Sequence, residues 1–294
     1  MILSIVGPTG VGKTKLSIEL AKRFNAIIIN NDAMQVYKYL NIGTAKPTLE
    51  EKEGIKHYLL DFVDPTINYT VYDYQKDVRK IINDNKDKNI IFVGGTGLYL
   101  KAALFDYRFE EETTNNNYED LSNEELYNLA LQKDKKMLIH KNNRQRLIRF
   151  LNKENSVVVE PKLLYPTIFI GLTTDRNNLY KRINDRVDSM IKNGLIDEVK
   201  QLYDNKINSK AINTAIGYKE LYKYFNKEIS LDEAIELIKK NSRHYAKRQY
   251  TWFNNQMNIK WFNTNYNDFN KTIYEVLDYI KSQTNIVWLL IIKF

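Results

Sequence analysis

The sequence predicts an α/β protein in which helices flank a parallel β-sheet. Short apolar runs bounded by turn residues recur along the chain, and most are rich in β-branched residues. They alternate with longer stretches of helical periodicity, a pattern typical of a parallel sheet covered by helices. With 294 residues, 43% of them hydrophobic, the chain can form a large core. The expected strands are Ile2–Val6, Ala26–Ile29, Asn89–Val93, Thr167–Leu172 and Ile259–Phe262.

Lys13–Phe24 has the pattern of a helix that packs on this sheet. Leu16, Leu20 and Phe24 recur at four-residue spacing, so they fall on one side of a helix. We expect this apolar stripe to contact the sheet.

A second helical region spans Arg182–Phe253, which consists almost entirely of helix-forming residues. Gly194 and Gly217 interrupt it, and Ser230 is placed to cap the helix that follows. We therefore expect several helices to be added to the α/β core.

A polar, acidic segment, Asp106–Asn123, breaks the alternation of strands and helices. We expect it to loop out before two helices, at Glu124–Leu131 and Asn143–Leu151. The predicted organisation is an α/β core of residues 1–105 and 163–294 with a predominantly helical insertion of residues 106–162.

The composition narrows the function classes. Lys and Arg outnumber Asp and Glu by 44 to 36, which gives a net charge of +8 and favours a polyanionic partner. The absence of cysteine excludes a disulfide scaffold, a thiolate nucleophile and any Cys-ligated metal site. The three histidines, His57, His140 and His244, are too scattered to indicate a tightly held metal.

The two ends of the sequence indicate a cytoplasmic protein without a membrane partner. Residues 1–6 lack the basic region of a signal peptide and lead directly into a glycine-rich turn. Ile286–Ile292 is strongly apolar, but it is far shorter than the ~20 residues that a membrane helix needs. We expect it to form a docked strand or an exposed apolar tail, and we expect the protein to be a monomer.

A phosphate-binding loop follows the first expected strand and opens the first expected helix, the context that a P-loop requires. Its glycines let successive N–H groups point into one concavity, and the helix N-terminus adds positive charge. Lys13 is placed to reach terminal phosphate oxygens, and the Thr14 hydroxyl is a candidate ligand of Mg²⁺, the expected cofactor. The fold class is therefore an α/β, P-loop NTPase-like core with a helical insertion. The residues expected to bind a diphosphate are Gly7, Thr9, Gly10, Val11, Gly12, Lys13 and Thr14.

Arg182 and Arg186 are candidates to complete the diphosphate clamp. They lie four residues apart and hence on one face of an expected helix. A solvated basic stripe remains an equal alternative for Arg186.

Two further strand ends carry polar groups. The strand at residues 90–93 does not end in the Asp that nucleotide hydrolases use to hold Mg²⁺, but in Gly94-Gly95-Thr96-Gly97. These glycines permit close approach of a substrate or make a tight turn, and both interpretations stay open; Thr96 then faces the crevice. Asp32 follows the second strand, where it is a helix cap, a Mg²⁺ ligand or a general base.

Taken together, these motifs resemble those of the tRNA dimethylallyltransferases, also called tRNA isopentenyltransferases or IPP transferases, in their shorter bacterial form. The ordered set of matches is far more specific than any single motif, and it runs along nearly the whole chain. Besides the P-loop, the matching segments are residues 31–37, 41–47, 57–61, 94–99, 139–143, 175–183, 215–221 and 246–253.

The resemblance implies that a dimethylallyl group passes from dimethylallyl diphosphate to N6 of the adenosine 3′ of the anticodon, in tRNAs that read codons beginning with U. It implies that Asp32 is the general base, that Thr96 helps to aim the amine, and that Arg182 binds the diphosphate. Because the amine nitrogen becomes strongly acidic as its bond to carbon forms, a carboxylate with an ordinary pKa of ~4 is sufficient.

The target base must leave the anticodon loop, which costs a few kcal/mol, so protein contacts must offset this cost. A basic helical segment at residues 239–248 is suited to hold loop phosphates, and Trp252 and Phe253 beyond it are expected in the core. The candidate tRNA-binding residues are Gln35, which follows Asp32 closely, and Lys240, Arg243, Lys247 and Arg248.

The chain departs from the family pattern in three places. Asn30 and Ala33 stand where the family usually has serines on either side of the aspartate, so the serine hydrogen bonds that would orient Asp32 are missing. Residues 149–152 read Arg-Phe-Leu-Asn instead of Arg-Ala-Leu-Glu. A chain without cysteine cannot form the C-terminal zinc finger of many eukaryotic relatives.

Three other functions are compatible with parts of the pattern. A P-loop small-molecule kinase would share the cradle and an Asp at the second strand end, but it leaves the long basic helical half unexplained. An adenylate isopentenyltransferase would use free AMP as acceptor. An RNA-binding protein with a vestigial cradle is disfavoured by Asp32 and Thr96.

Overall fold

The structure is a computed structural model that describes residues 1–109, 118–135, 137–153 and 161–291. Its Cα positions form two compact units, one of Met1–Phe105 with Leu163–Phe294 and one of Asp106–Lys162. We describe each unit by itself.

The larger unit is built on a six-stranded sheet in which every pairing is parallel. The strands lie in the order β3-β2-β4-β1-β5-β6. The five predicted strands are confirmed, and only the two-residue β3 was not predicted, because so short a run has no periodicity. The strands are β1 (Ile2–Val6), β2 (Ala26–Asn30), β3 (His57–Tyr58), β4 (Asn89–Val93), β5 (Thr167–Thr173) and β6 (Lys260–Asn263).

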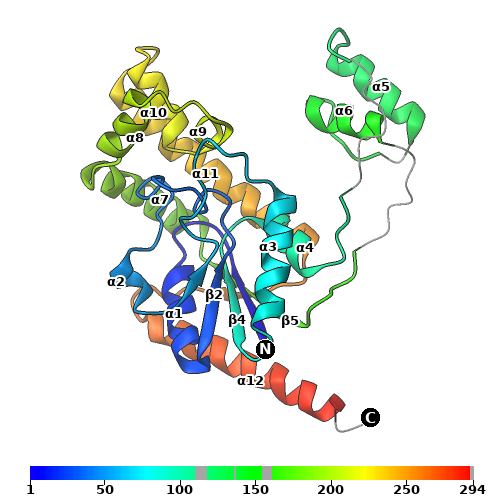
Figure 1. The fold of residues 1–294 in the computed structure, drawn as a ribbon, viewed down its shortest axis with the longest axis vertical. Helices are drawn as coiled ribbons and strands as arrows, with labels where there is room; N and C mark the ends of the chain where they lie inside the picture. Colours follow the sequence, from blue (N-terminus) through cyan, green and yellow to red (C-terminus); the bar gives the residue numbers. More distant parts are fainter. Residues whose placement is uncertain (110–117, 136, 154–160, 292–294) are drawn as a thin grey trace. The chain divides into compact units, whose positions relative to one another are not determined.

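Helices cover both faces of this sheet (Figure 1), so the predicted fold class is confirmed. α1 (Lys13–Phe24) and α12 (Phe269–Ile291) pack on one face, while α3 (Val71–Asp84) and α4 (Gly97–Leu104) pack on the other. Successive residues of a strand pack in the cores on opposite faces of the sheet, because their side chains point to opposite sides. In β2, for example, Ile28 joins the first core and Ile29 the second.

Of the two predictions for residues 286–292, the docked strand is wrong, and the exposed apolar tail stays a prediction. The backbone of α12 remains helical to Ile291, and Ile292 lies outside the described residues. The reason is that Ile273, Val276 and Ile280 anchor this helix on the sheet, and extending a formed helix is far easier than nucleating one. In the part of the chain that is described, no helix is long and apolar enough to cross a membrane.

Five helices form a second core above the carboxyl ends of the strands (Figure 1). The predicted interruptions are confirmed: Gly194 and Gly217 are N-caps, and the Ser230 hydroxyl accepts the N–H of Glu233 at the start of the longest helix. The helices are α7 (Arg176–Lys192), α8 (Leu195–Asp204), α9 (Lys210–Thr214), α10 (Tyr218–Phe225) and α11 (Leu231–Gln256). A one-turn helix, α2 (Leu49–Lys52), precedes β3.

The smaller unit contains α5 (Asn123–Lys133) and α6 (Arg144–Asn152), which pack around Leu126 and Leu147. Residues 110–117 of the expected loop lie outside the described residues. In the larger unit, the chain before and after this insertion is joined by an antiparallel bridge between Phe105 and Leu163.

Candidate active site

The P-loop connects β1 to α1 and has the backbone that its glycines permit. Gly7, Gly10 and Gly12 have φ angles of 139°, 85° and 93°, in the left-handed region that favours glycine. A Cβ on Gly7 would lie 2.3 Å from the carbonyl oxygen of Leu172, so no larger residue fits. Gly12 caps α1 without a side chain, which leaves the first N–H groups of the helix available to an anion.

Lys13, Thr14 and their neighbours supply the remaining donors. The ammonium group of Lys13 donates to the carbonyl of Pro8 at 2.7 Å. Burial and the nearby Arg186 lower the pKa of Lys13 to about 8, although the carboxylate of Asp32 acts in the opposite direction. Thr9 is half-buried, whereas the side chain of Val11 is fully buried and leaves only its backbone for the loop.

Asp32 lies just beyond β2, half-buried, and its backbone and carboxylate are fixed by local hydrogen bonds. Its carboxylate accepts the N–H of Met34 at 2.9 Å. The side chain of Asn30 accepts the N–H of Asp32 and donates to the carbonyls of Asp32 and Leu59. The asparagine that replaces the family's serine therefore holds this turn itself.

The pKa of Asp32 departs from the ordinary value that would be sufficient for a base. Burial raises the pKa of Asp32, while the Met34 N–H and the charges of Lys13 and Arg186 lower it. A carboxylate of raised pKa is a stronger base when it is ionised. The charges of Lys13, on the P-loop, and Arg186, on α7, both act on the pKa of Asp32 at the end of β2. These three elements therefore meet at one site.

Thr96 links the ends of two adjacent strands. Its N–H donates to the carbonyl of Asn31, and its hydroxyl accepts the N–H of Ala33, both at 3.0 Å. The hydroxyl of Tyr245 lies against the side chains of Thr96 and Gln249 and near the charge of Asp32. Thr96 is thus bonded to the residues on either side of Asp32.

The glycines of the 94–97 turn serve packing within the protein. A Cβ on Gly94 would lie 2.1 Å from the carbonyl oxygen of Asn31, and one on Gly97 would lie 1.9 Å from the indole of Trp252. At Gly95 the amide of Gln249 occupies that space and donates to the Gly95 carbonyl. These contacts show that the glycines are needed where the chain passes from β4 into α4, and close approach of a substrate stays a prediction.

Arg182 and Arg186 extend from α7 toward the P-loop at different depths. Arg182 is exposed, and its Nε donates to the carbonyl of Gly10 at 3.0 Å. Arg186 is half-buried, and burial lowers its pKa, whereas the carboxylates of Glu51 and Asp32 raise it. A solvated stripe therefore does not describe Arg186.

The candidate tRNA-binding residues fall into two groups. Lys240, Lys247 and Arg248 are exposed along α11, at spacings that place them on one stripe together with His244. Arg243 is half-buried and donates to the side chain of Asn184 at 2.6 Å.

Gln35 contacts the protein's own backbone. Its amide nitrogen donates to the carbonyls of Thr44 and Ala45, at 3.0 and 3.1 Å, so it holds the 41–47 loop next to Asp32. A hydrogen bond between Gln35 and an RNA base stays a prediction, in which the amide oxygen of Gln35 would accept from the base.

Sequence reasoning missed several residues that hold these loops. Glu198 accepts the N–H groups of Asn41, Ile42 and Gly43 and the hydroxyl of Tyr218. A Glu in the first turn of a helix is unremarkable in a sequence, so no local signal identified it. The pair of Tyr245 and Gln249 had a weak signal, because residues four apart share a helix face.

Few side chains near the P-loop could bind a cation, and those that could would do so through oxygen atoms. In the described residues no group of three or more His, Cys, Asp or Glu side chains could hold a metal ion. The half-buried Thr14 hydroxyl makes no hydrogen bond to any described residue, and Asp32 supplies one carboxylate nearby. Such a set fits a Mg²⁺ ion that takes most of its ligands from substrate phosphates and water.

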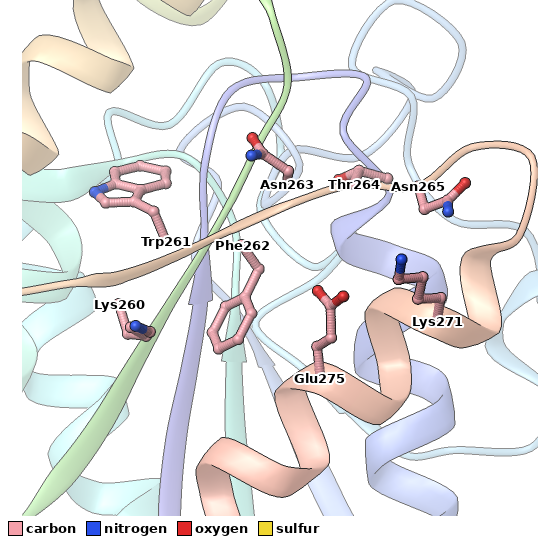
Figure 2. Close-up of a pocket in the computed structure, with 8 residues that line it drawn as sticks. All are labelled: Lys260, Trp261, Phe262, Asn263, Thr264, Asn265, Lys271 and Glu275. Carbon is pink, nitrogen blue, oxygen red and sulfur yellow. The ribbon is translucent and has the colours of Figure 1, made fainter.

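A separate pocket lies elsewhere in the core unit. A pocket of about 530 Å³ opens between β6 and α12, with Trp261, Phe262, Lys271 and Glu275 among its lining residues (Figure 2). It contains none of the candidate catalytic residues.

Comparisons with known proteins agree with this geometry. The family model described as IPP transferase matches residues 35–256. The tRNA dimethylallyltransferase of Anoxybacillus flavithermus is 46% identical over 300 residues, covering 96% of each chain. That of Fusobacterium nucleatum is 49% identical over 280 residues, covering 88% of this chain and 90% of the relative.

Solved structures of related proteins also match nearly the whole chain. The full-length tRNA isopentenylpyrophosphate transferase of Bacillus halodurans superimposes with a TM-score of 0.79 at 39% identity, covering 98% of both chains. A eukaryotic dimethylallyltransferase described as acting on tRNA gives a TM-score of 0.75 at 29% identity, covering 96% of this chain and 79% of the other.

Proposed function

The chain belongs to the IPP transferase family, and we propose that it transfers the dimethylallyl group of dimethylallyl diphosphate to N6 of the adenosine 3′ of the anticodon in tRNA. It is a prenyltransferase, and the reaction releases diphosphate. The relatives named above are tRNA dimethylallyltransferases, which disfavours a kinase or a free-nucleotide acceptor.

The donor binds through its diphosphate. The N–H groups at the start of α1, with Lys13 and Arg182, surround the site where negative charge accumulates as the allylic C–O bond breaks. Donors that are already oriented stabilise this developing charge more than they stabilise the bound substrate, and this difference lowers the barrier. Mg²⁺ held by Thr14 and the diphosphate oxygens would neutralise part of the same charge.

The acceptor reacts through its exocyclic nitrogen. As the C–N bond forms, the nitrogen becomes cationic, and the carboxylate of Asp32 takes one of its protons. The bond from carbon to the diphosphate oxygen breaks, and its electron pair leaves with the diphosphate. Thr96 is fixed next to Asp32 and supplies a hydroxyl to orient the amine.

The exposed cations of α11 serve as contacts for tRNA phosphates. Positive charge at this surface, with the net charge of +8, favours association with a polyanion. We assign the protein to the cytoplasm, where unmodified tRNA is found, and we expect it to act as a monomer.

One observation carries this proposal: the charges of Lys13 and Arg186 both lower the pKa of Asp32 at the carboxyl ends of β1 and β2, where Thr96 is also fixed. A diphosphate in the P-loop and an amine at Asp32 then belong to one reaction centre. In open α/β sheets this edge is where ligands bind.

The test is an acceptor comparison. Purified protein, dimethylallyl diphosphate and Mg²⁺ are incubated with unmodified tRNA or with AMP, and the nucleosides are analysed for prenylated adenosine. We expect product from tRNA alone, and chelation of Mg²⁺ should reduce it. Preferential prenylation of AMP, or ATP-dependent phosphorylation of a small acceptor, would refute the proposal.

A further inference from the structure

A segment beyond the region matched by the family model packs against the outer side of the P-loop. Thr264 to Phe269 follows β6 and leads into α12, and Figure 2 shows its first residues leaving the strand. The hydroxyl of Thr264 donates to the carbonyl of Val11 at 2.8 Å, and the ring of Phe269 occupies the space where a Cβ on Gly12 would lie. The P-loop is thus supported from the C-terminal part of the chain.

Tyr266, in the middle of this segment, lies under the guanidinium group of Arg182. The guanidinium carbon is 3.8 Å from the centre of the ring, within the range of a close cation–π contact. The Tyr266 hydroxyl lies 3.5 Å from the carbonyl of Gly10, which also accepts the Nε–H of Arg182. Ring, guanidinium and loop therefore form one packed unit.

The contact leaves the binding end of Arg182 available. Its Nε is engaged by Gly10, whereas its two terminal nitrogens make no hydrogen bond to any residue that the structure describes. These two nitrogens form the fork that binds phosphate oxygens in a bidentate manner. Because Arg182 is exposed, an unsupported side chain would lose much rotamer freedom on binding an anion.

We propose that Tyr266 is a positioning residue that holds the Arg182 guanidinium in place for the donor diphosphate. The inference rests on the proposed function, since it takes the P-loop ligand to be a diphosphate. It predicts that the aromatic ring increases donor affinity through Arg182 and has no direct effect on the acceptor.

The test compares Tyr266→Leu with Tyr266→Phe in donor binding and in turnover. Loss of the ring should weaken binding of inorganic pyrophosphate with Mg²⁺, measured by calorimetry, by about 5-fold, the scale of one partly exposed cation–π contact. The KM for dimethylallyl diphosphate should rise by a similar factor, while the KM for tRNA stays unchanged. Phenylalanine keeps the ring and should restore most of the affinity.

A double-mutant cycle separates positioning from a general structural effect. In an Arg182→Ala background, Tyr266→Leu should have no further effect on pyrophosphate affinity. Tyr274→Leu, the same change at a 61% exposed side chain of α12, should change neither constant.

Three outcomes would overturn the inference: unchanged pyrophosphate affinity in Tyr266→Leu, an equal loss in the Arg182→Ala background, or a parallel rise in the KM for tRNA. Failure of the proposed function is distinguishable, because the wild-type protein would then transfer no dimethylallyl group to tRNA.

Discussion

Replacing Asp32 by asparagine separates the chemistry of this carboxylate from its role in the fold. Asparagine keeps an oxygen that accepts the Met34 N–H, which is 2.9 Å from the carboxylate, and the bonds from Asn30 to the Asp32 backbone are unaffected. The turn should therefore persist, while the carboxylate that we propose as the proton acceptor is lost.

The expected loss of activity is large. A positioned general base contributes about 10²- to 10⁴-fold to a rate, so the single-turnover rate of Asp32→Asn should fall within that range. The measurement is formation of prenylated adenosine at saturating donor and tRNA. Affinity for tRNA, measured by gel shift, should be unchanged, because the exposed cations of α11 are not altered.

The Asp32→Asn variant should lose activity but gain stability. Since burial raises the pKa of Asp32, folding favours its protonated form, and ionised Asp32 destabilises the folded state. The variant should therefore have a higher Tm than the wild-type protein near pH 7. The difference should vanish as the pH falls below the unfolded-state pKa of about 4, where both side chains are neutral.

A matched control is Asp278→Asn, because Asp278 is exposed on α12. It should change neither the rate nor the Tm. A turnover rate for Asp32→Asn within about 3-fold of the wild type would refute the assignment of Asp32 as base, since general bases contribute far more.

Three further changes have definite outcomes. Lys13, with a pKa of about 8, loses its charge as the pH rises through that value, so pyrophosphate affinity measured by calorimetry should decline there; a flat profile to higher pH would contradict the assignment. Gly97→Ala places a methyl group 1.9 Å from the Trp252 ring and should reduce stability by about 1–3 kcal/mol in denaturant unfolding. That loss should shrink in a Trp252→Leu background, and equal losses in both backgrounds would exclude the clash as its cause. Lys247→Gln should lower the salt dependence of tRNA binding by about one unit of slope, and an unaltered slope would remove Lys247 from the phosphate contacts.

Local patterns were sufficient to predict the α/β core. The P-loop is contiguous, and its glycines, Lys13 and Thr14 take their roles from one turn between a strand and a helix. The strands were recognisable because buried parallel strands are continuous apolar runs. The position of Asp32 beside the P-loop also followed from topology, since parallel strands end at the same edge.

The remainder depended on contacts between distant segments. Gly94 and Gly97 are small because Asn31 and Trp252 occupy the space beside them, and no neighbouring residue reveals this. The pKa of Asp32 depends on burial, which a sequence motif does not report. The contact of Tyr266 with Arg182 joins the segment between β6 and α12 to α7, far apart along the chain, so only the folded structure reveals it.

The antiparallel bridge between Phe105 and Leu163 has an evolutionary consequence. Because the two backbone ends at this point are already hydrogen-bonded neighbours, a short hairpin turn is sufficient to connect them. Lengthening, exchange or loss of the intervening 106–162 unit therefore leaves the six-stranded sheet intact, so this junction is a natural site for insertions of different length and sequence.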